Sequence, residues 1–235
     1  MRLPDSALRL ISYYQRHGFW VAWRHAAVLF WRAVFQNGRV LLRCDLKMGQ
    51  PQPVSSLPDG LTIERIQSSE QIHEQDWQKL TRDRTPAICH RSFGERFRKG
   101  ASMWAARSNG DIAGYGWTQT CDRVETYYPA DGNDVYLFEF LVFPEHRGRR
   151  INSLLIGHIL SALALEGKAR AYLDVDQWNK AGLNSYRRTS FLPVAISKAR
   201  LLRPRKLVKW ISPNEVGWED AELPAEKAAA TDRKV

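Results

Sequence analysis

Apolar and polar residues follow two different periods along the chain, and these periods predict alternating strands and helices. Short apolar runs bounded by turn-forming residues predict strands, whereas apolar residues spaced three and four apart predict helices. We expect strands at 39–46, 61–66, 102–108, 112–121, 134–143, 170–176, 191–201 and 206–211. We expect helices near 70–82, 87–98, 148–165 and 180–188. Strands mixed with helices in this way indicate a sheet of the α/β or α+β class.

The first segment of the chain has a pattern of its own. Residues 5–37 contain no proline and predict helices broken near Gly18, and five polar side chains between His17 and Gln36 share about one third of a helical wheel. The remaining arc is apolar and rich in aromatic residues, which is more apolar coverage than a surface helix needs. Such a helix must be covered by its own domain, by a second copy in a homodimer, or by the anionic inner face of a membrane.

Shifts in composition divide the chain into four parts. A stretch rich in Pro, Ser and Gly follows the first predicted strand and is typical of a linker. The predicted parts are a basic, aromatic helical appendage at 1–50, a linker at 51–60, a domain at 61–212 and a disordered tail at 213–235. The third part is long enough to bury a core of its own.

The charge balance and the cysteines narrow the class of protein. The chain has 235 residues, with 35 Lys and Arg against 25 Asp and Glu, so its net charge is +10. This charge favours phosphate-bearing or membrane-surface partners, but no signature of a nucleic-acid-binding domain is present. The three cysteines are far apart and lack metal-ligand spacing, which predicts a reduced, cytoplasmic protein without a metal site. The chain contains no run of about 18 apolar residues, so we predict no membrane-spanning helix. Its first residues also lack the pattern of a secretory signal.

The segment 134–167 carries the clearest chemical signal. An apolar strand ends at Pro144, the basic turn HRGRR follows, and then apolar residues recur at helical spacing. The free N–H groups and the positive dipole end of such a helix make the turn a site for an anion such as pyrophosphate. Arg147, Arg149 and Arg150 add positive charge to the turn, although three solvated surface arginines would give the same pattern.

Two stretches of the sequence resemble the GNAT superfamily of acyl-CoA-dependent N-acyltransferases. The stretch LVFPEHRGRRIN is similar to the superfamily's coenzyme A signature, which reads V-x-P-x-x-R-G-x-G-x-G or A. The stretch from Asn179 to Phe191 is similar to a second pattern, in which Tyr186 follows Asn179 by seven residues and precedes Phe191 by five. The resemblance implies a GNAT-type mixed, mostly antiparallel sheet flanked by helices, with the N-terminal helical appendage added.

The resemblance implies an N-acetyltransferase that uses acetyl-CoA and acetylates a primary amine by direct attack on the thioester. The acceptor classes are an amino sugar, a small amine and a lipid-linked amine. Arg150 and Asn152 stand where the family has small residues in the phosphate loop. Gly182 replaces an alanine or serine, and Ser190 replaces the glycine before the phenylalanine. These departures leave open a catalytically inactive GNAT-fold module that binds a partner or regulates.

By resemblance, coenzyme A lies against the strand end, the basic turn and the start of the next helix. The residues implied are Leu141, Val142, Phe143, Arg147, Gly148, Arg149, Arg150, Ile151, Asn152 and Asn179. A backbone N–H between Leu141 and Phe143 would hold the oxyanion, and Tyr186 would protonate the departing sulfur. Both Asn179 and Tyr186 have plainer alternatives, as a helix N-cap and as a packed aromatic residue.

Asp174 and Glu139 are the candidates for the base that deprotonates the amine. Each is a lone acid in an apolar strand, where an unpaired charge is costly and needs a reason. Relatives that place a glutamate base near the position of Asp174 favour that residue, whereas Glu139 lies on the strand beside the thioester. A salt bridge from either acid to an arginine is the alternative. Six aromatic residues either line the acceptor pocket or belong to the core: Trp104, Trp117, Tyr127, Tyr128, Tyr136 and Phe138.

Overall fold

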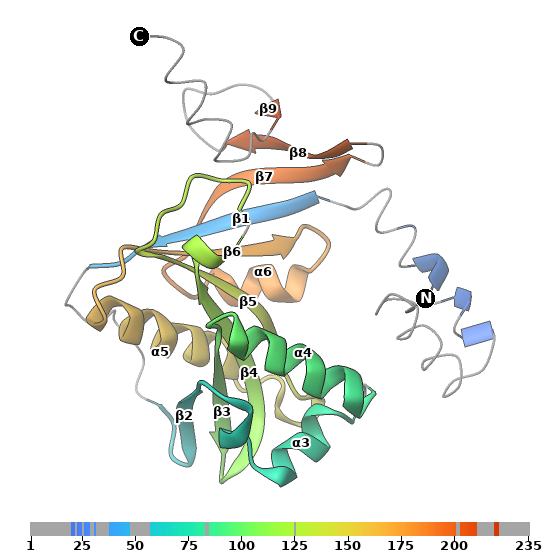
Figure 1. The fold of residues 1–235 in the computed structure, drawn as a ribbon, viewed down its shortest axis with the longest axis vertical. Helices are drawn as coiled ribbons and strands as arrows, with labels where there is room; N and C mark the ends of the chain where they lie inside the picture. The colour runs from blue at the N-terminus through green and yellow to red at the C-terminus, as the bar shows by residue number, and fades with distance from the viewer. Residues whose placement is uncertain are drawn as a thin grey trace.

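The strands of the protein form one mixed sheet. The computed structural model describes residues 38–47, 57–82, 85–124, 126–200, 203–210 and 219–220, together with eight helical residues between 20 and 31. The strands in these ranges are β1 (Gly38–Asp45), β2 (Leu61–Ile66), β3 (Ser102–Ser108), β4 (Asp111–Thr120), β5 (Asp134–Val142), β6 (Arg170–Asp176), β7 (Leu192–Arg200), β8 (Arg203–Trp210) and β9 (Glu219–Asp220). Their order in the sheet is β2-β3-β4-β5-β6-β1-β7-β8-β9 (Figure 1).

Helices cover both faces of this sheet. The helices of the described ranges are α3 (Glu74–Leu80), α4 (Pro86–Arg98), α5 (Ile151–Leu165) and α6 (Lys180–Tyr186), with 3₁₀ turns η1 (Ser69–Gln71), η2 (Cys121–Arg123) and η3 (Pro144–His146). On one face, Leu155 and Ile159 of α5 pack on Leu137 and Leu173 of the central strands. On the other face, α3 and α4 pack on β3 and β4, and Phe93 of α4 is fully buried there.

The only parallel pairing among the described strands joins β5 to β6, which confirms the predicted mostly antiparallel sheet. This pairing runs from Asp134 opposite Arg170 to Leu137 opposite Leu173 and then stops. Over their carboxyl-terminal halves the two strands therefore have no ladder of hydrogen bonds between them. The sheet is opened at its centre, at the point where the basic turn follows β5.

The first strand of the chain lies inside the sheet. β1 pairs antiparallel with β6 on one side and with β7 on the other, so that Arg39 stands opposite both Asp176 and Ser197. The sequence assigned this strand to an appendage, and the predicted linker at 51–60 does not separate it from the sheet. β1 fills the position between β6 and β7 because its alternating Leu41 and Leu42 are buried on opposite faces.

The predicted helix at 148–165 begins three residues later than expected, at Ile151. Gly148 and Arg150 have φ values of 80° and 59°, which a right-handed helix cannot contain. The predicted helix at 70–82 is split into η1 and α3. Most of the predicted helix at 5–37 lies outside the described residues, and so does the predicted tail at 213–235 apart from β9.

Candidate active site

A bulge in β5 lies at the point where β5 leaves β6. The register with β4 shifts between Tyr115 and Trp117, and Glu139 has a φ of 50°. Phe138 packs with the core under α4, whereas Phe140 packs with the core under α5. Because the bulge adds one residue to the alternation, Glu139 faces α4 together with Phe138. The sequence pattern LFEFLV predicted a regular strand and did not indicate this bulge.

Two glycines of β4 make room for the bulge. A Cβ atom on Gly116 would lie 2.3 Å from a ring carbon of Phe140. A Cβ atom on Gly114 would lie 2.7 Å from the carbonyl oxygen of Leu141. Neither glycine was predicted to have a role, although glycines at alternate positions of a strand are typical of a close backbone approach or a bulge.

The predicted phosphate loop has a backbone that fits a pyrophosphate. Gly148 has a positive φ, and no atom lies within 4 Å of the position that its Cβ would take. Arg150 is left-handed at the N-cap of α5 and gives no side-chain cap to the helix. The N–H groups of the first turn of α5 are therefore not capped by that side chain and can serve an anion. Arg147, Arg149 and Arg150 are all exposed around this loop.

Asn152 does not fill the phosphate loop, although it replaces a small residue of the family pattern. Its Nδ2 donates a hydrogen bond of 2.9 Å to Oγ of Ser185, at the end of α6. Ser153 donates to the backbone oxygen of the same Ser185 over 3.3 Å. The Asn152 carboxamide is thereby drawn toward α6. Its Oδ1 is buried and has no hydrogen-bond partner among the described residues.

The backbone N–H groups of Leu141, Val142 and Phe143, which are the predicted oxyanion donors, point in different directions. The N–H of Phe143 donates to the carbonyl oxygen of Ala113 over 3.0 Å, so it points to β4 and is already used. Successive N–H groups of a strand point to opposite edges. The N–H of Val142 therefore points away from β4, toward the opening between β5 and β6, and that of Leu141 points toward β4. Arg147 Nε donates to the carbonyl oxygen of Val142 over 3.2 Å and fixes this strand end.

Tyr186 lies at the end of α6, on the α5 side of the sheet. Its side chain is 8% exposed, and its ring packs edge-on against Phe191 with centroids 6.3 Å apart. Burial raises the pKa of Tyr186 to about 12, and a hydrogen bond from Asn152 offsets part of this rise. The phenol is therefore protonated at neutral pH and is available as a proton donor.

Asn179 caps the helix that carries Tyr186. Its side-chain oxygen accepts a hydrogen bond of 2.9 Å from the N–H of Gly182, as the N-cap alternative predicted. A Cβ atom on Gly182 would lie 2.8 Å from Nδ2 of Asn179. An alanine or serine here would require the Asn179 side chain to shift. A contact of Asn179 with coenzyme A stays a prediction.

The two candidate bases lie on the face opposite α5 and have different partners. Glu139 forms an ion pair with Arg96 of α4. The Arg96 guanidinium also lies 5.0 Å from the ring centroid of Trp117 and 5.5 Å from that of Phe138. Asp174 instead accepts a hydrogen bond from the hydroxyl of Tyr127, which comes from the loop between β4 and β5. The salt-bridge alternative is therefore observed for Glu139.

The six aromatic candidates divide between core and surface. Trp104, Trp117 and Tyr128 are buried in the core. Tyr127, Tyr136 and Phe138 are half-buried on the face that carries the two acids. The rings of Tyr136 and Phe138 are stacked, with centroids 5.7 Å apart and planes inclined by 9°. These three residues could contact an acceptor, because they lie beside the opening in the sheet.

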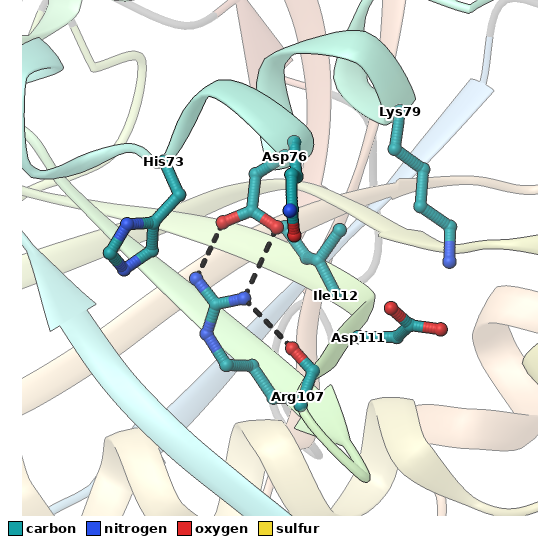
Figure 2. A pocket seen from close by; sticks show the side chains of 8 residues that line it. His73, Asp76, Lys79, Arg107, Asp111 and Ile112 are labelled. Atoms are coloured by element: carbon teal, nitrogen blue, oxygen red, sulfur yellow. Dashed lines mark hydrogen bonds and ion pairs between the residues drawn. The ribbon is translucent and has the colours of Figure 1, made fainter.

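A pocket of about 400 Å³ lies elsewhere, between α3 and the turn that joins β3 to β4 (Figure 2). Arg107 crosses it and binds both carboxylate oxygens of Asp76, at 2.5 and 3.1 Å. The same guanidinium binds Glu64 over 2.8 Å and the carbonyl oxygen of Gly110 over 3.2 Å. Arg107 is thus paired with two carboxylates, and no lining residue belongs to β5, β6 or α6. The pocket is therefore not the centre of the chemistry.

None of the described helices is both long and apolar enough to cross a membrane. Within the same residues, no group of three or more His, Cys, Asp or Glu side chains could hold a metal ion.

The site combines a sheet that opens beside a glycine-containing basic turn with a buried tyrosine at the end of α6. The chain belongs to the GNAT acetyltransferases: the sequence model described as "Acetyltransferase (GNAT) family" matches residues 64–191, more than half of the chain. None of the curated proteins matches the chain significantly in sequence.

Solved structures share the fold at low sequence identity. A tandem GNAT protein from the clavulanic acid biosynthesis pathway is 15% identical, with a TM-score of 0.55 over 78% of this chain and 56% of that one. A GCN5-related N-acetyltransferase from Sphaerobacter thermophilus is 17% identical, with a TM-score of 0.50 over 76% of this chain and 53% of that one. A GNAT-family acetyltransferase from Novosphingobium aromaticivorans is 16% identical, with a TM-score of 0.45 over 68% and 61%. The chain thus spans between half and two thirds of the length of these structures.

Proposed function

We propose that the chain is an acetyl-CoA-dependent N-acetyltransferase that transfers an acetyl group to a primary amine. The observation that carries this proposal is the opening between β5 and β6, which begins after Leu137 and Leu173. Tyr186 lies on one side of the sheet next to this opening, and Asp174 lies on the other. A thioester that entered from the α5 side would meet an amine held on the α4 side.

The residues of the loop and strand end fit coenzyme A. The uncapped first turn of α5, with Gly148 and the exposed Arg147 and Arg149, would hold the pyrophosphate. The edge of β5 beyond Leu137 would hold the extended arm through backbone hydrogen bonds. Bound there, acetyl-CoA supplies the activated acyl group.

The side chains around the opening would divide the proton transfers between them. A free alkylamine has a pKa near 10.4 and is charged at neutral pH, so Asp174 removes one proton from its ammonium group, directly or through a water. The neutral nitrogen then forms its bond to the carbonyl carbon and loses its second proton to water, and the carbon–sulfur bond breaks to release coenzyme A. The N–H of Val142 stabilises the negative charge that develops on the carbonyl oxygen. Tyr186 donates a hydrogen bond or a proton to the departing sulfur.

The partners of the two acids favour Asp174 over Glu139 as the base. An ion pair with a guanidinium occupies the carboxylate oxygens that a base would turn toward the substrate amine. Glu139 has such a contact with Arg96, whereas the contact that Asp174 makes with Tyr127 is to a neutral hydroxyl. Glu139 would therefore keep the bulge in shape.

The pKa of Tyr186 indicates whether this residue transfers a proton to the departing sulfur or only donates a hydrogen bond to it. A pKa of about 12 lies roughly 3.5 units above that of a thiol near 8.5, which corresponds to about 5 kcal/mol against full transfer. A hydrogen bond from the phenol that strengthens as the thiolate forms requires much less. We therefore expect Tyr186 to stabilise the leaving group mainly as a donor.

Two variants and one binding measurement test this function. We expect Tyr186→Phe and Asp174→Asn to lower turnover at least tenfold in a thiol-release assay, with little change in affinity for acetyl-CoA by calorimetry. A panel of an amino sugar, a diamine and a lipid-linked amine would supply the acceptor. If the wild-type chain gave neither binding heat nor a thermal shift at millimolar acetyl-CoA, the alternative of an inactive binding or regulatory module would replace this proposal.

The segment before β1 would bring the enzyme to an anionic membrane surface, at the inner face. Gly38 at the start of β1 accepts a hydrogen bond of 2.9 Å from the N–H of Gln177, just beyond the carboxyl end of β6. The preceding segment therefore joins the sheet at its opened end. Of its described residues, Trp20, Trp23 and Trp31 are 79%, 63% and 56% exposed. Exposed tryptophans next to basic side chains suit the interface of an anionic bilayer, and the acceptor would then be lipid-linked.

Flotation on vesicles of anionic phospholipid tests this contact. Deleting residues 1–50 would also remove β1 from the sheet, so the comparison uses the full chain with Trp20, Trp23 and Trp31 replaced by alanine. We expect the wild type to float with the vesicles and the triple variant to remain below. Equal recovery of both, with a dimer in sedimentation, would assign the segment to a homodimer contact instead.

A further inference from the structure

The loop between β4 and β5 reaches across the sheet to Asp174. The Tyr127 hydroxyl donates a hydrogen bond to Oδ1 of Asp174 on β6. Ser197 on β7 donates from its Oγ to the Tyr127 hydroxyl over 3.3 Å. Three distant parts of the chain thus form one row of hydrogen bonds that ends on the carboxylate.

The backbone on either side of Tyr127 is anchored. Tyr128 is 3% exposed, and its ring packs on that of Tyr172 with centroids 4.6 Å apart. Thr126 is buried, and its Oγ1 donates to the carbonyl oxygen of Tyr128 over 2.9 Å. The Tyr127 ring packs edge-on against Tyr128 with centroids 5.3 Å apart. These contacts hold the hydroxyl in place, so it can hold the carboxylate in turn.

We propose that Tyr127 is the positioning residue that orients the Asp174 carboxylate for its role as base. The inference rests on the proposed function, because Asp174 must be the base for its orientation to matter. A fixed donor on Oδ1 restricts the rotation of the carboxylate and stabilises its charged form. Burial and the negative charge of Asp174 raise the pKa of Tyr127, so the phenol stays protonated and acts as a donor.

Other polar groups around Asp174 also act on its charge. Arg39 on β1 attracts the carboxylate, and Tyr136 on β5 and Tyr128 on the loop lie within electrostatic range. Asp176 on the same strand binds Arg39 over 3.1 Å and shares its positive charge. Arg39 therefore does not act on Asp174 alone. Removing the Tyr127 hydroxyl leaves all of these groups in place, so its effect on Asp174 can be measured separately.

The variant Tyr127→Phe tests the proposal, with Tyr128→Phe as its matched control. Both remove one phenol from the same loop, but the hydrogen bond to Oδ1 of Asp174 comes from Tyr127, whereas the Tyr128 hydroxyl lies beside Cys121. The pKa of Asp174 is measured by carboxyl-carbon NMR titration, with Asp174→Asn to assign the signal. Turnover is measured against pH with acetyl-CoA and an amine from the panel that the wild type acetylates.

We expect Tyr127→Phe to raise the pKa of Asp174 and the acidic limb of the kcat/KM profile together, by about one unit. The kcat should fall roughly tenfold, which corresponds to about 1.4 kcal/mol, with the KM for acetyl-CoA unchanged. Tyr128→Phe should change neither the pKa of Asp174 measured by NMR nor the apparent pKa of the acidic limb of the kcat/KM profile.

Two results would overturn the proposal in distinguishable ways. If Asp174→Asn abolished turnover while Tyr127→Phe matched the wild type in kcat and pH profile, Tyr127 would have a structural role only. If Asp174→Asn kept the wild-type rate, the assignment of the base would be wrong, and Tyr127 could not position it.

Discussion

Arg150 offers a way to separate backbone strain from charge in the phosphate loop. Its backbone has φ 59° and ψ 15°, the left-handed conformation in which the family pattern has glycine. A residue with a Cβ atom pays about 1–2 kcal/mol for this conformation. Glycine avoids that cost, but it loses about 0.4–1 kcal/mol through the greater freedom of the unfolded chain.

The comparison of Arg150→Gly with Arg150→Ala isolates the strain, because both variants remove the guanidinium. From the difference between these two costs, we expect Arg150→Gly to have a free energy of unfolding about 0.5–1 kcal/mol higher than that of Arg150→Ala. For a chain of this size, that corresponds to a melting temperature roughly 1–4 °C higher for Arg150→Gly than for Arg150→Ala. Thermal unfolding followed by circular dichroism, without ligand, measures this difference.

Binding of acetyl-CoA to the same pair of variants measures the contribution of the charge. If the Arg150 guanidinium contacts a phosphate, both variants should bind more weakly than the wild type, with Arg150→Gly the tighter of the two because its backbone allows a closer approach. An Arg150→Ala variant as stable as Arg150→Gly would show that position 150 is not strained, and the account of this loop would be wrong.

Three further perturbations test other parts of the structure. Replacing Arg147 by alanine should weaken the binding of acetyl-CoA by about 1–3 kcal/mol in calorimetry; unchanged affinity would remove Arg147 from the phosphate site. Replacing Asp76, which is 5% exposed, by asparagine should lower the free energy of unfolding in urea by about 1.5–3 kcal/mol, because it removes one charge-assisted pair and leaves Arg107 with Glu64 as its carboxylate partner; a loss below about 1 kcal/mol would contradict this. Burial raises the pKa of Cys44 to about 11 and those of Cys121 and Tyr186 to about 12, so these groups stay neutral in the folded chain at a pH where the unfolded chain ionises. The free energy of unfolding should therefore fall as the pH rises from 9 to 11, by up to about 1.4 kcal/mol per pH unit for each group. A urea midpoint that stayed constant over that range would show that these three groups are not held neutral by burial.

The spacing of apolar residues along the chain predicted much of the fold. The strands and helices between residues 61 and 200 lie close to their predicted positions, because their apolar spacing suits the faces that they bury. The turn around Gly148 and the helix start that follows were also predictable, since they depend on consecutive residues, whereas their binding of a phosphate stays a prediction. The N-cap alternative for Asn179 was predictable for the same reason, because an N-cap acts within its own turn.

The tertiary structure decided whatever depends on pairing between distant segments. The sequence could not place β1 between β6 and β7, because the ion pair of Arg39 with Asp176 joins residues 137 positions apart. It left the choice between Asp174 and Glu139 open, because each acid is distinguished by a partner more than 40 positions away, Tyr127 or Arg96. The bulge at Glu139 likewise depends on the glycines of the neighbouring strand. Periodicity reports which face a residue buries, but the chemistry of a carboxylate is set by the group that touches it, and that contact exists only once the chain has folded.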